Sequence, residues 1–68
     1  MSGTEFVRRA KRYARKFGLP FRFDPSVGKG SHGRLHIGGR FTTVPRKELG
    51  KGLLAAMLKD LGMDGEVF

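Results

Sequence analysis

Apolar residues recur at helical spacing near both ends of this chain, and the residues between these two stripes alternate in the manner of strands. The first stripe consists of Phe6, Val7, Ala10, Tyr13, Ala14 and Phe17. The second consists of Leu53, Leu54, Met57, Leu58 and Leu61. A stripe with this spacing lies along one face of a helix and has to be covered by another element. The chain is therefore predicted to fold as two helices packed on a small sheet.

Local signals mark the ends of both predicted helices. Ser2 fits the position of a helix cap, and Glu5 three residues later can complete a capping box. Gly18, closely followed by Pro20, is typical of a helix end. We therefore expect the first helix over about residues 4–17. The second helix is expected to end at Gly62.

Three segments between the helices have the character of strands. They are Phe21–Asp24, Ser31–Ile37 and Arg40–Val44. Gly38-Gly39 is a two-residue hairpin signal between the second and third strands. In the second strand, Leu35 and Ile37 share one face by the period of two, so His32, Arg34 and His36 share the other. We expect a loop over Pro25–Gly30 and an irregular connection over Arg46–Gly52.

These elements predict an α+β domain of two layers in the order α-β-β-β-α. A three-stranded antiparallel sheet with both helices on one face would cover the apolar stripes. The 68 residues are expected to form one domain. A domain this short buries only about 60% of its unfolded surface, and a chain without cysteine cannot add a disulfide. We expect a binding partner or self-association to contribute stability.

The charge balance points to a polyanionic partner. Lys and Arg total 14 against 6 for Asp and Glu, which gives a net charge of +8. So much positive charge on a small body favours binding to nucleic acid, although a solvated surface is the plainer interpretation. No apolar run is long enough to span a membrane, and the N-terminus lacks the apolar core of a signal peptide. We therefore expect a cytoplasmic protein with no membrane partner.

The segment Gly28-Lys29-Gly30-Ser31-His32 carries the clearest chemical signal. Glycines allow the backbone unusual conformations and close approach by a ligand. Lys29 between them can meet a phosphate as a point charge. His32 can give or take a proton near neutral pH. Together they favour work on a phosphodiester, with His32 as the catalytic candidate.

Further residues are candidates for binding RNA. Arg34 and Lys29 flank His32 and could hold the scissile phosphate, or could be ordinary surface charge. Ser31 could bond a phosphate or simply begin the strand. Arg12 and Arg15 are expected to track the RNA backbone, or to attract an acidic partner. His36 is a second acid–base candidate or a stacking surface for RNA. No cluster of residues has metal-ligand spacing, so neither a metal nor another cofactor is expected.

Several motifs resemble the HicA family of bacterial toxins. Gly30-Ser31-His32 is similar to the motif that opens the second strand of that family. Thr42-Thr43-Val44-Pro45-Arg46 resembles its strand-ending pattern. Gly52-Leu53-Leu54, followed by Met57-Leu58-Lys59-Asp60-Leu61-Gly62, is similar to its final helix and glycine stop. The resemblance covers nearly the whole chain.

The resemblance implies a fold like that of a double-stranded-RNA-binding domain and cleavage of mRNA by the motif histidine. It also implies a cognate HicB-type antitoxin that covers the site, and hence a hetero-oligomer. RNA carries its own nucleophile in the 2′-OH, so cleavage needs only a base, an acid and cations for the phosphorus charge. We therefore expect a metal-independent endoribonuclease. A non-catalytic RNA-binding module of the same fold is the alternative, and a protein-interaction subunit is a third hypothesis.

Overall fold

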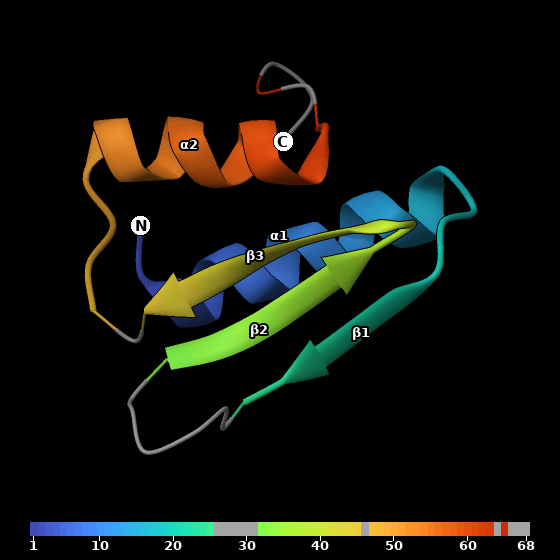
Figure 1. Cartoon of the computed structure of the whole chain (residues 1–68), viewed down its shortest axis with the longest axis horizontal. Coiled ribbons are helices and arrows are strands. Elements are labelled where there is room, and N and C mark those ends of the chain that lie inside the picture. Colours follow the sequence, from blue (N-terminus) through green and yellow to red (C-terminus); the bar gives the residue numbers. More distant parts are fainter. Residues whose placement is uncertain (26–31, 46, 64, 66–68) are drawn as a thin grey trace.

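A computed structural model of the chain describes residues 1–25, 32–45, 47–63 and 65 (Figure 1). Its elements are α1 (Gly3–Lys16), β1 (Phe21–Asp24), β2 (His32–Ile37), β3 (Arg40–Pro45) and α2 (Lys51–Leu61). The predicted order of helix, three strands and helix is confirmed, and most predicted boundaries agree to within one or two residues. No helix among the described residues is long and apolar enough to cross a membrane.

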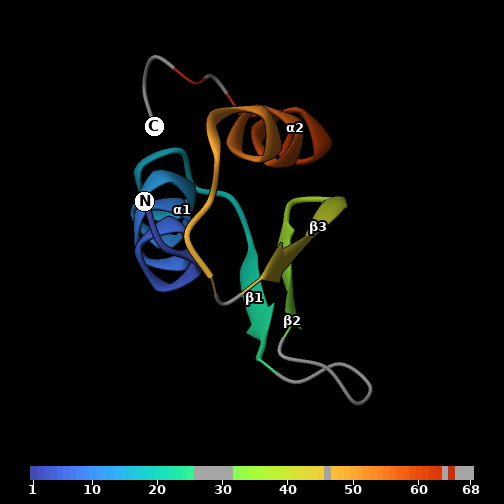
Figure 2. The ribbon, with the colours of Figure 1, turned by 90° about the vertical axis from the view of Figure 1, so that its left-hand side faces the viewer.

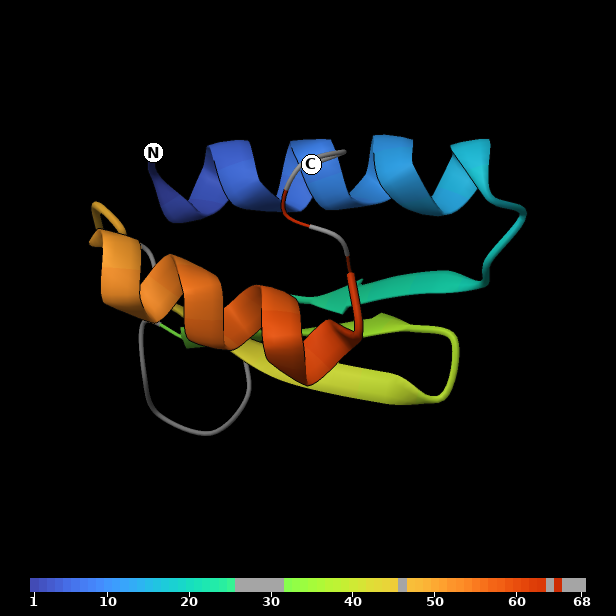
Figure 3. The same ribbon diagram turned by 90° about the horizontal axis from the view of Figure 1, so that it is seen from above.

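The three strands form one antiparallel sheet in the order β1-β2-β3. Ile37 pairs with Arg40 across the turn at Gly38 and Gly39, so the predicted two-residue hairpin is confirmed. Gly38 has a φ of 61°, a conformation that favours glycine. The helix α1 lies behind the sheet in Figure 1, whereas α2 runs along the edge strand β3 (Figures 2 and 3). The α+β class is therefore confirmed.

The first helix begins and ends where its capping signals predict. The Oγ of Ser2 accepts a hydrogen bond from the backbone N–H of Glu5 at 3.1 Å. After Lys16 the chain turns through Gly18, whose φ of 66° is left-handed. The helix buries Phe6, Ala10 and Ala14 against the sheet, and the two alanines allow the close approach of helix and sheet.

Two residues of the predicted apolar stripes are not part of the core. Phe17 is 49% exposed because it follows the last residue of α1, where the sheet no longer covers the apolar face of the helix. Leu53 is 39% exposed because α2 runs along the edge strand β3, so that one side of this helix faces solvent. The apolar stripes are thus covered only in part, contrary to the expectation that the fold would cover them fully.

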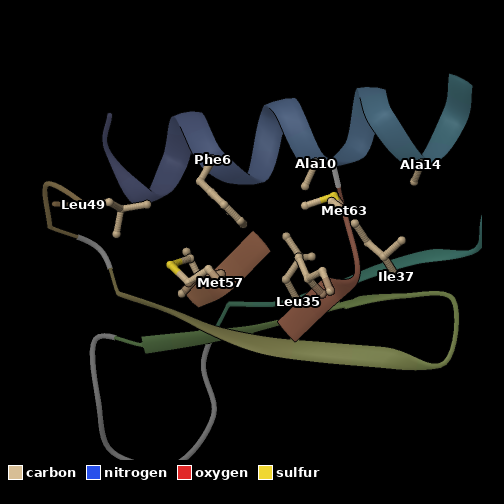
Figure 4. Close-up of a cluster of buried hydrophobic side chains, with 10 residues drawn as sticks. Phe6, Ala10, Ala14, Leu35, Ile37, Leu49, Met57 and Met63 are labelled. Atoms are coloured by element: carbon tan, nitrogen blue, oxygen red, sulfur yellow. The ribbon is translucent and has the colours of Figure 1, made fainter. Parts of the chain in front are cut away.

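The core lies between the two helices and one face of the sheet (Figure 4). Leu35 and Ile37 of β2 are buried, as the alternation in that strand predicts. From α2, Met57 and Leu61 complete the centre. The remaining buried apolar residues are Phe6, Ala10, Ala14, Val44, Leu49 and Met63. Thr42 is also buried, and its hydroxyl donates to Asp60 of α2 at 3.1 Å, which ties β3 to that helix.

The connection before α2 is more ordered than its sequence predicts. Ser2 and Glu48 form an isolated antiparallel bridge. The N–H of Gly3 donates to the carbonyl of Lys47 at 3.2 Å, and that of Leu49 donates to the carbonyl of Met1 at 2.8 Å. The start of α1 is therefore held against the connection that follows β3. A β-carbon at Gly3 would lie 2.0 Å from the carbonyl oxygen of Pro45, so only glycine fits there.

Candidate nucleic-acid interface

One face of the sheet carries neither helix. It is the face toward the viewer in Figure 1, opposite the side on which α1 lies (Figure 2). The strand register places six residues on this open face: Arg22, Asp24, Arg34, His36, Phe41 and Thr43. Their side chains alternate with those that enter the core, such as Leu35 and Thr42. The open face therefore combines positive charge, one carboxylate and an aromatic ring.

At the centre of the open face, three side chains of β2 and β3 lie against one another. The guanidinium carbon of Arg34 is 5.2 Å from the centroid of the Phe41 ring, within the range of a cation–π contact. The His36 ring lies 5.9 Å from the same ring, tilted by 35°. His36 faces Phe41 directly in the register of the two strands, whereas Arg34 faces Thr43 and reaches Phe41 diagonally. Arg34, His36 and Phe41 therefore form a cross-strand cluster.

This cluster is open to solvent. Phe41 is 54% exposed, the highest fraction among the large apolar side chains of the described residues. Arg34 is also exposed, and His36 is half-buried. Arg22 on β1 is opposite His36 and adds a second exposed guanidinium. Asp24 is opposite Arg34 and brings a carboxylate to the same face.

Of the predicted site residues, Arg34 and His36 are brought together on the open face. His32 begins β2, where its backbone pairs with Pro45, and it has the parity of Arg34 and His36 within the strand. Its side chain lies outside what the structure describes. Lys29 and Ser31 also lie outside the described residues. The prediction of a phosphate-binding loop beside the histidine is therefore not tested.

The structure separates Arg12 and Arg15 from the open face. Both are exposed on α1, which lies on the opposite side of the sheet (Figure 2). Nearby on the same helix, the Glu5 carboxylate is 3.3 Å from the Nε of Arg9 and 3.7 Å from Arg8. The basic residues thus form two surfaces in two layers. One RNA strand contacting both surfaces would have to pass around an edge of the molecule.

Phe41 is the member of the site that sequence reasoning missed. The hairpin could have revealed its position. A two-residue turn at Gly38-Gly39 pairs Ile37 with Arg40, and the next pair along the strands is then His36 with Phe41. With Val44 on the core face, the period of two then places Phe41 on the face of the histidines. The strand reads Arg-Phe-Thr-Thr-Val, and its single aromatic residue is the one that points away from the core.

A groove of about 610 Å³ opens on the other side of the sheet, next to the start of β2. Residues of α1 and of all three strands line it: Gly3, Thr4, Val7, Arg8, Phe23, Pro25, Gly33, Val44 and Pro45. Gly33 is required here, since a β-carbon at this position would lie 2.6 Å from the Phe23 ring. Apolar side chains dominate the lining, so the groove offers fewer groups for a polyanion than the open face does.

The chemistry available on the open face follows from these side chains. Arg22 and Arg34 can neutralise phosphates, and the exposed ring of Phe41 can stack on a base. The described residues contain no group of three or more His, Cys, Asp or Glu side chains placed to hold a metal ion. Comparisons with protein-family models, with curated proteins and with solved structures found no match for this chain.

Proposed function

We propose that this protein is a small endoribonuclease of the HicA-like toxin class, which acts on mRNA in the cytoplasm. The open face of the sheet carries this proposal, because Arg22, Arg34 and His36 gather there on a chain with a net charge of +8. The order α-β-β-β-α with a three-stranded antiparallel sheet also agrees with a fold like that of a double-stranded-RNA-binding domain.

In the proposed reaction the RNA supplies the nucleophile. A base removes the proton of a ribose 2′-OH, and the 2′ oxygen forms a bond to the neighbouring phosphorus. The bond from phosphorus to the 5′ oxygen breaks, and this oxygen takes a proton from an acid. The products are a 2′,3′-cyclic phosphate and a free 5′-OH. His32 is assigned the proton transfer, and guanidinium groups balance the charge that grows on the phosphoryl oxygens.

The position of His32 supports this assignment. It stands at the start of β2, at the end of the strand that also holds Arg34 and His36. A single acid–base group contributes about 10²–10⁴-fold to a rate, so the enzyme is expected to be slow. Slow turnover suffices for a toxin, because each cut destroys a message. A HicB-type antitoxin is the proposed inhibitor, and it would cover the site in a hetero-oligomer.

A non-catalytic RNA-binding module is the second candidate function. The cluster of Arg34, His36 and Phe41 favours it, because such a cluster binds RNA whether or not a proton is transferred. A protein-interaction subunit would neither bind nor cut RNA on its own. The three functions therefore differ in what the purified chain does to a transcript.

The decisive experiment compares His32→Ala with His36→Ala. Each purified variant is incubated with a transcript, while circular dichroism reports the fold and filter binding reports the RNA affinity. His32→Ala should slow cleavage by about 10²–10⁴-fold with little change in affinity. His36→Ala should weaken binding and leave the chemical step at saturating RNA nearly unchanged. Inducible expression should arrest growth with the wild-type chain and not with His32→Ala.

If folded His32→Ala cuts at the wild-type rate, the histidine assignment is wrong. If the wild-type chain binds the transcript without cutting it, the RNA-binding module replaces the nuclease. If it does neither, the protein-interaction subunit is the remaining candidate.

A further inference from the structure

The exposed ring of Phe41 is the feature of the open face that phosphate binding does not explain. Its cross-strand neighbours Arg34 and His36 contact it from two positions of β2, at 5.2 and 5.9 Å between the groups. Neither neighbour covers the ring, since 54% of Phe41 remains exposed. An aromatic ring held in this way at the centre of a basic surface has the features of a stacking platform for a nucleobase.

We propose that Phe41 stacks on an unpaired base of the RNA, and that Arg34 and Arg22 neutralise phosphates on either side of it. This inference rests on the proposed action on RNA and adds where and how the strand is held. The base must be unpaired, because a base inside a duplex has both faces occupied by its neighbours. The open face of the sheet, and not α1, is then the surface that binds the substrate.

Charge favours RNA over a protein as the occupant of this face. Arg22 and Arg34 are exposed, and only Asp24 among the six residues of the open face is acidic. Among these six residues Phe41 is the only apolar one, and together with Thr43 it lines a hollow with Leu53 and Ala56 of α2. A stacked base needs one exposed aromatic ring, and the phosphates on either side of the base need cations.

The strand register also gives the distance between the stacked base and the proposed catalytic residue, His32. Phe41 is opposite His36, which is four residues from His32 along β2. At about 3.3 Å per residue this is a separation of about 13 Å along the strand. The base on Phe41 therefore belongs to a nucleotide outside the scissile step. Substitution of Phe41 should raise KM for RNA and leave kcat nearly unchanged.

The test uses Phe41→Leu and Phe41→Tyr, with Phe17→Leu as the matched control. Phe17 is similarly exposed, at 49%, and has Lys16 5.7 Å from its ring centroid, but it lies at the end of α1 away from the open face. Binding is measured by fluorescence anisotropy with a labelled single-stranded oligonucleotide carrying 2′-O-methyl riboses, which cannot supply the nucleophile. The same oligonucleotide annealed to its complement is the duplex probe.

We expect Phe41→Leu to weaken single-strand binding by between about 5-fold and 150-fold, the range for losing one base–aromatic stack. Phe41→Tyr should retain most of the affinity, and Phe17→Leu should change it by less than about 2-fold. The chain contains no tryptophan, so Phe41→Trp and Phe17→Trp each introduce one indole reporter. The indole at position 41 should be quenched by the single strand and not by the duplex.

Four outcomes would overturn the inference. If Phe41→Leu and Phe17→Leu bind the single strand equally well, or if the indole at position 41 is not quenched, RNA does not stack on this ring. If the wild-type chain binds the duplex as tightly as the single strand, the base does not have to be unpaired. If the wild-type chain binds neither probe, the proposed action on RNA itself fails, and the open face belongs to a protein partner.

Discussion

Replacing Gly3 by alanine should destabilise the fold, whereas the same replacement at Gly52 should stabilise it. Both glycines lie in the first turn of a helix, Gly3 in α1 and Gly52 in α2. They differ in what a β-carbon would meet. At Gly3 it would lie 2.0 Å from the carbonyl oxygen of Pro45, which is backbone and cannot rotate away. At Gly52 no atom lies within 4 Å.

The size of the effect follows from these contacts. A contact shorter than 3.0 Å is not tolerated, so α1 and the end of β3 would have to separate by at least about 1 Å. That movement strains the hydrogen bonds from Gly3 to Lys47 and from Leu49 to Met1. Overpacking costs about 1–3 kcal/mol, against a gain of about 0.5–1 kcal/mol for alanine over glycine in a helix. The expected net loss for Gly3→Ala is therefore about 1 kcal/mol, and at most about 2.5 kcal/mol.

Thermal and urea unfolding of the two variants beside the wild-type chain measure this difference. For a domain of this size, 1 kcal/mol shifts Tm by about 4–8 °C. Gly3→Ala should therefore melt several degrees below the wild-type chain. Gly52→Ala should melt at or slightly above it, with a gain of at most about 1 kcal/mol. A Gly3→Ala variant as stable as the wild-type chain would show that the close approach of α1 to Pro45 is not a constraint on the fold.

Two further predictions concern the core and the electrostatics. Leu35→Ala should cost about 2–5 kcal/mol in urea unfolding, because Leu35 is fully buried. Arg34→Ala beside it removes only the exposed cation–π contact with Phe41 and should cost at most about 1 kcal/mol. Equal losses would contradict the assignment of the two faces of β2. If single-stranded RNA binds the open face, Arg22→Ala with Arg34→Ala should reduce the log–log salt slope of binding by about 1.4, at about 0.7 per phosphate contact. The pair Arg12→Ala with Arg15→Ala removes the same charge from α1 and should change the slope much less; the reverse result would place the RNA on α1.

Local patterns predicted the elements of this fold because each element carries its own signal. Ser2 and Gly18 bound α1, Gly62 ends α2 with a φ of 67°, and the two glycines after Ile37 make the hairpin. The alternation in β2 also predicted which side chains enter the core. Each of these signals depends on the backbone conformation and hydrogen bonds of a few neighbouring residues, so it can be recognised without knowing the rest of the fold.

The contacts that escaped prediction join distant parts of the chain. The bridge between Ser2 and Glu48 joins residues that are far apart in the sequence, and neither residue type indicates such a pairing. The exposure of Phe17 and Leu53 also depends on where the sheet ends and where α2 lies along it. A helical stripe shows which side of a helix is apolar, but not how far the neighbouring element extends.

The separation of the two basic surfaces bears on how a partner could inhibit the protein. Arg12 and Arg15 on α1 are on the side of the sheet opposite Phe41 (Figure 2). An acidic antitoxin held only by α1 would leave the open face free, so it would not block the substrate directly. If the protein acts on RNA as proposed, direct inhibition requires the partner to reach the open face and compete for Arg22 and Arg34. Under the proposed function, the positive charge of α1 would attract RNA or an acidic partner, and the ring and guanidinium groups of the sheet would recognise it.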